Sequence, residues 1–176
     1  MNQTNFWNDA AKYGAIIGCV SAACSLLSDI TGVGIFGFIG FAVYLWLLVH
    51  YTQKRASLYS TLEEEYGYGK RLGFIVAMAL FIGVINAAYT ILASRILFTA
   101  KYSAAYEQMF AVFAKTGFYT NEMIVQMNRM VQSPLWITVS AVLGQLIIGL
   151  LFGLVLAAVA QPRQRFDNNP TNHTEE

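Results

Sequence analysis

Four long apolar stretches constrain this chain more than any other feature of its sequence. They cover residues 13–30, 33–51, 72–98 and 134–160. Each reaches the length of roughly 17–25 residues that an α-helix needs to cross the hydrocarbon core of a bilayer. Only 12% of the 176 residues are charged, whereas soluble domains carry roughly 25%. A soluble fold this small would expose too much apolar surface. We therefore predict an all-α fold, a four-helix transmembrane bundle in contact with the lipid bilayer.

The basic residues are unevenly distributed between the two ends of these spans. Seven of the eleven would lie on one side, near the N-terminus, in the 52–71 loop and in the tail. Because basic residues close to span ends favour the cytoplasm, we predict that both termini are cytoplasmic. We expect one membrane domain over residues 1–161 and a disordered cytoplasmic tail over 162–176. The formal net charge is +1, so no basic footprint indicates nucleic acid.

The 99–133 segment between the third and fourth spans carries two helical patterns. Aromatic and methionine side chains recur at helical spacing up to Gly117, and a second apolar pattern follows Thr120 or Asn121. The two sets are Tyr102, Tyr106, Met109, Phe110 and Phe113, then Met123, Met127, Met130 and Val131. We predict two short amphipathic helices that lie on the outer membrane face or fold over the bundle. A docking surface for a partner or a lipid-like ligand is the alternative.

Two amide side chains fall at the same depth in the third and fourth spans. At about 1.5 Å per residue, Asn86 and Gln145 each lie roughly 21–22 Å from the inner ends of their helices, with Tyr89 one turn from Asn86. An interhelical hydrogen bond is one interpretation, worth about 0.6–2 kcal/mol. The other is a midplane polar site that binds a small ligand between these two spans.

A carboxylate and a guanidinium lie towards the outer ends of the first and third spans. Asp29 ends a span that also contains Ser21, Ser25 and Ser28. Arg95 lies farther out along the third span, but helical side chains lean towards the helix N-terminus, here inward. An Asp29–Arg95 ion pair is therefore one candidate. A hydrated aspartate beside an arginine that extends to the interface is the other.

Small residues recur four apart on two of the spans. Gly14 and Gly18 form one such pair, and Gly149 and Gly153 form another. Pairs of this kind let helix backbones approach closely. They are candidate helix-packing surfaces, within the chain or between copies of it.

The chain lacks the short motifs that mark well-known catalytic sites. It has no metalloprotease, phosphate-binding, nucleophile-elbow or dinucleotide pattern. His50 and His173 have no partners at metal-ligand spacing. We therefore expect neither an enzyme nor a bound cofactor or metal.

Three segments together resemble a known family. They are FWNDAAKYGAIIG, YGYGKRLGFIVAMALFIGVINAAYTIL and SPLWITVSAVLGQLIIGLLFGLVLAA. The chain resembles the domain of unknown function 4199, a group of small four-span proteins of Bacteroidetes. The resemblance implies a bacterial inner-membrane protein. It implies no activity and carries no catalytic residue.

Two hypotheses for function follow. The first is a structural or accessory membrane protein that associates with itself or with a membrane-protein partner, which the glycine pairs and the loop helices favour. The second is a small transporter or ligand-binding membrane protein that uses Asn86, Tyr89 and Gln145 as a midplane site. The second predicts a cavity between the third and fourth spans, and a direct Asn86–Gln145 contact without adjacent space would contradict it.

Overall fold

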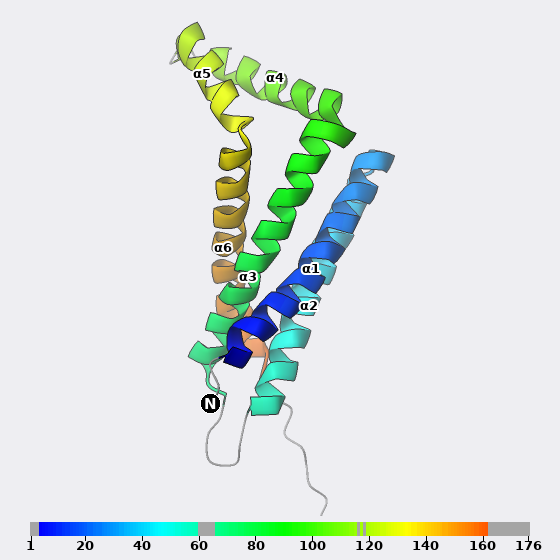
Figure 1. Cartoon of the computed structure of the whole chain (residues 1–176), viewed down its shortest axis with the longest axis vertical. Helices are drawn as coiled ribbons and strands as arrows, with labels where there is room; N and C mark the ends of the chain where they lie inside the picture. The colour runs from blue at the N-terminus through cyan, green and yellow to red at the C-terminus, as the bar shows by residue number, and fades with distance from the viewer. Residues whose placement is uncertain (1–3, 60–65, 116, 118, 162–176) are drawn as a thin grey trace, which may run out of the picture.

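The computed structural model describes residues 4–59, 66–115, 117 and 119–161 of the chain. These residues form seven helical segments joined by short turns, with no strand among them (Figure 1). The expected all-α fold is confirmed for this part of the chain. The segments are α1 (Thr4–Thr31), α2 (Ile35–Tyr59), α3 (Tyr68–Leu92), η1 (Ala93–Leu97), α4 (Thr99–Lys115), α5 (Asn121–Val131) and α6 (Pro134–Val159).

Four helices are long enough and apolar enough to cross a membrane. They are Phe6–Thr31, Ile35–Tyr59, Tyr68–Leu97 and Pro134–Val159. This set is compatible with a multi-pass membrane protein, and it matches the four stretches that the sequence predicted. α1 begins and α2 ends about two turns beyond the predicted limits. Hydropathy finds only the apolar part of a helix, whereas these polar extensions contain no glycine or proline to stop it.

The helix ends follow local sequence signals. Gly32, which follows α1, has a φ of 69°, a conformation that a side chain disfavours. This turn reverses the chain into α2. The Ser133 hydroxyl accepts a hydrogen bond from the Trp136 amide at 3.2 Å and caps α6. Thr120 caps α5 in the same way.

The predicted glycine pairs pack against α3, which lies between α1 and α6. A Cβ added to Gly149 would lie 2.5 Å from the Cβ of Ala79, and one added to Gly18 would lie 2.9 Å from the Cβ of Ile85. Gly14 and Gly153 also face α3 within 3.0 Å of its atoms by the same measure. Only glycine permits these approaches without a shift of the helices. Both pairs are therefore used for packing within the chain.

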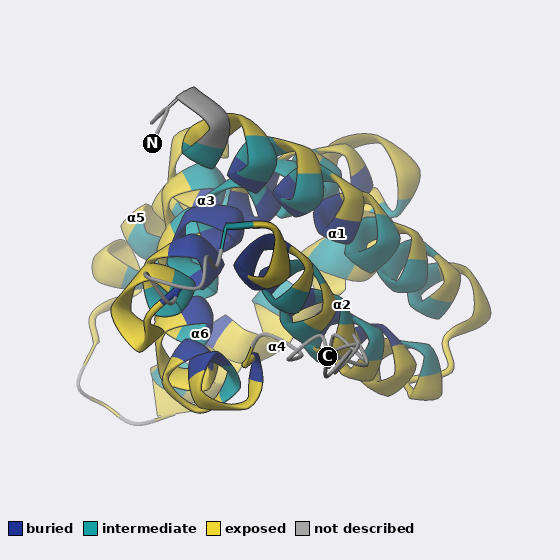
Figure 2. Ribbon diagram, turned by 90° about the horizontal axis from the view of Figure 1, so that it is seen from below, coloured by how far each residue is buried: buried dark blue, intermediate teal, exposed yellow. Residues whose placement is uncertain are grey.

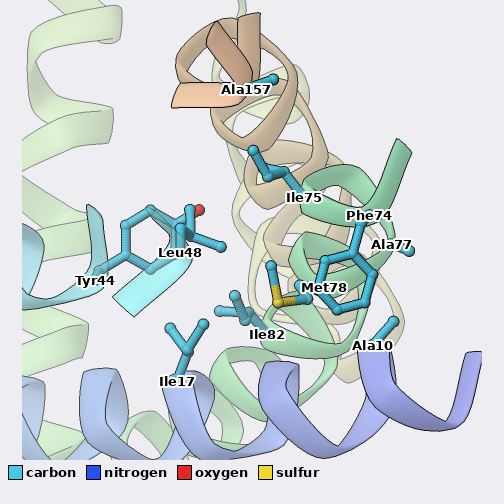
Figure 3. Close-up of a cluster of buried hydrophobic side chains, with 10 residues drawn as sticks. All are labelled: Ala10, Ile17, Tyr44, Leu48, Phe74, Ile75, Ala77, Met78, Ile82 and Ala157. Carbon is cyan, nitrogen blue, oxygen red and sulfur yellow. The ribbon is translucent and has the colours of Figure 1, made fainter. Parts of the chain in front are cut away.

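The hydrophobic core lies at one end of the bundle, the end where α1 begins and α6 ends (Figure 1). We call this half the base; it comprises residues 6–17, 44–59, 66–82 and 149–160. Figure 2 shows dark blue, buried surfaces on the inward sides of its helices. Its core side chains, drawn in Figure 3, are Ala10, Ile17, Tyr44, Leu48, Phe74, Ile75, Ala77, Met78, Ile82 and Ala157.

The base also contains a buried cation. Arg55 of α2 is only 2% exposed and forms an ion pair with Asp9 of α1. Its Nε donates to the Tyr66 hydroxyl at 3.1 Å. Its guanidinium also lies over the rings of Phe6 and Phe74, 5.2 and 4.9 Å from their centroids. The sequence had indicated only a basic residue in a cytoplasmic loop, whereas this arginine links three helices.

At the other end of the bundle, α4 and α5 extend from the ends of α3 and α6 (Figure 1). The π-helical segment η1 ends α3, and the chain turns at Phe98 into α4, which runs across the end of the bundle (Figure 1). Helices therefore occupy both parts of the 99–133 segment where the sequence predicted them. Phe110 is the one buried residue of α4, and no described residue of α5 is buried. These helices are attached mainly at their ends.

Candidate functional site

A polar hollow of about 360 Å³ lies beyond the base, towards α4. Its walls come from the end of α1, the start of α2, the end of α3 and the first turn of α4. The lining residues are Ser25, Ser28, Asp29, Gly37, Asn86, Tyr89, Thr90 and Tyr102. All of them except the glycine have polar side chains. The hollow therefore differs from the apolar helices around it.

Asp29 is the centre of the hydrogen bonding in this hollow. Its Oδ2 accepts from the hydroxyls of Tyr89 at 2.7 Å and Tyr102 at 3.1 Å. Its Oδ1 forms an ion pair with the Lys101 ammonium at 2.9 Å, and the same ammonium donates to the Asp29 backbone oxygen at 3.3 Å. These contacts tie the end of α1 to α3 and α4. The carboxylate is thus held by three donors from two other helices.

The predicted ion pair between Asp29 and Arg95 is wrong, because Asp29 pairs with a different residue. Both residues are described, and Asp29 pairs with Lys101 instead. Arg95 donates from a terminal guanidinium nitrogen to the backbone oxygen of Gln132 at 2.6 Å. The π-helical segment that contains Arg95 is the physical reason, because a wider turn rotates the side chains that follow it relative to a regular α-helix. Arg95 therefore reaches the turn between α5 and α6 rather than α1.

A second hollow of about 170 Å³ adjoins the first and shares Ser25 and Gly37 with it. Its other lining residues are Ser21, Cys24, Gly40, Phe41, Tyr44, Gln145 and Ile148. We call the two hollows together the cleft. Tyr44 is 4% exposed, and the Gln145 side chain is the polar group beside its hydroxyl, although their contact lacks the geometry of a full hydrogen bond. A buried hydroxyl with so weak a contact marks a place for a water or a ligand group.

The three predicted midplane residues all line the cleft, but not together. Asn86 and Tyr89 line the first hollow, and Gln145 lines the second. α3 and α6 pack closely between them, since a Cβ added to Gly83 would lie 2.9 Å from the Cα of Val142. The space lies against the α1–α2 hairpin, not between the third and fourth spans as the ligand-binding hypothesis predicted.

Burial and the charge of Asp29 keep the Tyr102 hydroxyl protonated, so that it can donate a hydrogen bond. Burial raises the pKa of Tyr102 to about 12, and the neighbouring Asp29 charge adds to this effect. Ionising the phenol would place a second negative charge beside the carboxylate. The Tyr102 hydroxyl therefore keeps its proton at neutral pH and continues to donate to Asp29.

Sequence reasoning missed part of the cleft. Ser25, Ser28 and Asp29 lie on one face of α1 at spacings of three and four residues, which a helical projection of the polar positions would have revealed. Thr90 follows Asn86 by one turn in the same way. Lys101 and Tyr102 had no such signal, because their position depends on the direction in which α4 leaves η1.

The described residues contain no group of three or more histidine, cysteine, aspartate or glutamate side chains placed to hold a metal ion. Comparisons of the chain with protein-family models, with curated proteins and with solved structures found no match. The interpretation of the cleft therefore depends on its own geometry and chemistry.

Proposed function

We propose that this chain is a multi-pass membrane protein that binds a small polar ligand in the cleft, as a transporter or a ligand-binding component. The observation that carries the proposal is the hollow of about 360 Å³ whose side chains are polar within otherwise apolar helices. Pockets that bind small molecules have volumes of roughly 300–1,000 Å³. The first hollow lies within this range.

The depth of the polar residues supports the same proposal. An ionisable side chain in a membrane span costs up to about 2.5–3.5 kcal/mol at the helix centre, and such groups usually face a cavity or a partner. Asp29, Asn86 and Tyr89 belong to helices long enough to span a membrane, and all three face the hollow. Asp29 and Tyr89 are joined by an interhelical hydrogen bond, so the polar groups that remain for a ligand are their unused acceptor positions and the Asn86 amide.

The packed core of the base supports entry of the ligand into the cleft from the α4 end. The core side chains fill the base, whereas the first hollow opens near α4. With the termini cytoplasmic, as the basic residues predict, the cleft opens to the outer side of a bacterial inner membrane. The resemblance to the domain of unknown function 4199 agrees with that location. A transport cycle would then require the base to open while the α4 end closes.

Ligand-dependent stabilisation tests the proposal. The full-length protein in lipid nanodiscs would be heated with panels of small cationic, neutral and anionic metabolites. A ligand at 100 times its Kd stabilises the folded state by about 2.7 kcal/mol, which raises the melting temperature by several degrees. Asn86→Leu, which replaces a polar lining group with a larger apolar side chain, is expected to abolish that rise. Ser140→Leu is the matched control, because Ser140 is exposed on α6 and donates to Trp136 of its own helix.

Two results of this experiment would contradict the proposal. One is the absence of stabilisation by every class of compound. The other is a stabilising compound whose effect survives Asn86→Leu, since that compound would bind elsewhere.

An accessory role is the second candidate, and the surface of α5 favours it. Met123 and Met130 of this helix are exposed, and their spacing of seven residues places them on one face of α5. The glycine pairs no longer support self-association, because they pack against α3. Crosslinking in native membranes, compared between the natural chain and Met130→Glu, tests this role. Loss of a specific crosslink in the variant is the expected result.

A further inference from the structure

We propose that the cleft binds its ligand through a primary ammonium group, which takes the position that the Lys101 ammonium holds on Asp29. This inference rests on the proposed ligand-binding function and names the chemical class of the ligand. Three features support it: the hydrogen-bonding capacity of the first hollow, its charge, and the exposure of Lys101.

Four of the five hydroxyl groups that line the first hollow have already used their hydrogens, and the fifth belongs to Ser25. Tyr89 and Tyr102 both donate to Asp29 Oδ2. The Thr90 hydroxyl donates to the Asn86 backbone oxygen at 2.9 Å, and the Ser28 hydroxyl donates to the Val33 backbone oxygen at 3.4 Å. A hydroxyl has one hydrogen and two lone pairs, so these four oxygens can only accept from a ligand. A ligand that fits them must bring donors.

The charge of the lining residues points in the same direction. Asp29 is the one side chain among the lining residues that is ionised at neutral pH. A ligand carboxylate would meet a like charge there. A primary ammonium instead supplies three N–H donors together with a positive charge, and charge-assisted hydrogen bonds of this kind are roughly twice as strong as neutral ones. The rings of Tyr89 and Tyr102 beside the carboxylate add a favourable surface for a cation.

Lys101 occupies this position from outside the hollow. Its side chain is 51% exposed, and it is not among the lining residues. Exposed ion pairs favour the paired arrangement only about 1.4-fold to 5-fold. The flexible four-carbon stem lets the ammonium leave for water at this small cost. We infer that Lys101 is a tethered competitor that neutralises Asp29 until a ligand ammonium arrives.

The second hollow defines the rest of the ligand. It continues from the first hollow through Ser25 and Gly37, and it brings the apolar surfaces of Phe41 and Ile148 together with the buried Tyr44 hydroxyl. A ligand with a short carbon chain would extend from Asp29 towards Phe41. A polar group at its far end would reach the Tyr44 hydroxyl beside the Gln145 side chain.

Binding of three probes of equal size tests the inference. Propylammonium, 1-propanol and propionate would be titrated against the full-length protein in nanodiscs, with binding followed by ligand-detected NMR. Propylammonium alone is expected to bind. Lys101→Gln should bind it about 1.4-fold to 5-fold more tightly, because the competitor is removed. Lys115→Gln, at the other end of α4, is the matched control and should leave the affinity unchanged.

Asp29→Asn should weaken propylammonium binding at least tenfold, because it replaces a charged acceptor with a neutral amide. Its thermal unfolding curve would show whether the variant is folded. The test does not depend on this variant, since Lys101→Gln changes an exposed side chain and predicts an effect of opposite sign. A residue that merely stabilised the cleft would weaken binding when replaced, whereas a competitor strengthens it.

The outcomes separate this inference from the function on which it rests. Unchanged or weaker propylammonium binding in Lys101→Gln would overturn the role of Lys101. Binding of propanol or propionate that Asn86→Leu abolishes, without binding of propylammonium, would overturn the ammonium and leave the cleft as a ligand site. If propylammonium binds neither the natural chain nor Lys101→Gln, the ligand class is wrong. The wider thermal panel then decides whether any ligand binds.

Discussion

The base and the cleft are built from the same helices, yet they treat polar groups in opposite ways. In the base, Arg55 is surrounded by an aspartate, a tyrosine hydroxyl and aromatic rings. In the cleft, Asp29 is held at one edge of a hollow, and the acceptor lone pairs around it face open space. A saturated polar group stabilises a single arrangement, whereas spare hydrogen-bonding capacity makes a site that a second molecule can complete.

The packing residues explain how one bundle contains both halves. In the base, Gly149 and Gly153 bring α6 against α3, and side chains such as Phe74 and Met78 fill the centre. In the cleft, small residues face one another instead, with Ser25 opposite Gly37. Because these residues of α1 and α2 are small, they leave a space between the two helices. The base also contains buried polar atoms that are not satisfied, since the Thr52 hydroxyl and the Arg71 Nε have no hydrogen-bond partner among the described residues.

The largest expected effect is the loss of the buried cation. Arg55→Met should lower the free energy of unfolding by about 3–5 kcal/mol, because it leaves Asp9 without its partner. Chemical unfolding in detergent micelles measures the change. Arg129→Met, at an exposed position on α5, is the matched control and should stay within about 0.5 kcal/mol. Adding Asp9→Asn to Arg55→Met should recover part of the loss. No recovery would show that the ion pair is not the source of the stability.

A smaller effect is expected from the glycine contacts of the base. Gly149→Ala should destabilise the chain by about 1–3 kcal/mol, since the added methyl group would overlap Ala79. Gly144→Ala, one turn closer to the cleft, should cost nothing, because a Cβ there has no neighbour within 4 Å. Thermal unfolding of both variants tests the difference. If Gly149→Ala changes the oligomeric state without changing stability, the glycine surface serves assembly instead of folding.

Replacing tyrosine with phenylalanine should have different effects inside the base and at its boundary with the cleft, where Tyr44 lies. Tyr66→Phe in the base removes an acceptor from Arg55 and should cost about 1.5–3 kcal/mol, the usual value for a hydrogen bond to a charged group. Tyr44→Phe removes a buried hydroxyl whose contact with Gln145 lacks full hydrogen-bond geometry. It should be neutral or stabilise the chain by about 1 kcal/mol. Equal losses in the two variants would mean that the Tyr44 hydroxyl has a partner in solution, and the contrast between base and cleft would fail at this position.

The sequence predicted the features of the cleft that depend on neighbouring residues in the chain, but not those that depend on contacts between distant helices. Hydropathy and helix signals are local, so they gave the four spans and the position of α5 after Thr120. The depth of Asn86 and Gln145 was also local, and both residues line the cleft. Which helix each residue faces depends on rotation about the helix axis and on η1. For this reason the Lys101 partner of Asp29 and the position of the space against the α1–α2 hairpin could not be predicted.

The smallest expected effect is a loss of stability at high pH in the cleft. The phenol of Tyr102 ionises near pH 10 in an unfolded chain, whereas burial and the Asp29 charge raise its pKa to about 12 in the folded protein. Between these values the unfolded state has released a proton that the folded state keeps. The free energy of unfolding should therefore fall as the pH rises from about 10 to about 12.

Tyr102→Phe isolates this contribution from the other groups that titrate in the same range. The lysines and the remaining tyrosines are common to both proteins, so their effects cancel in the difference. The variant should lose less stability than the natural chain over this interval, as measured by chemical unfolding at a series of pH values. Parallel curves would mean that the Tyr102 hydroxyl is exposed to water in the folded protein. The contact between α4 and Asp29 would then be open, and the cleft would be accessible without displacement of the Tyr102 side chain.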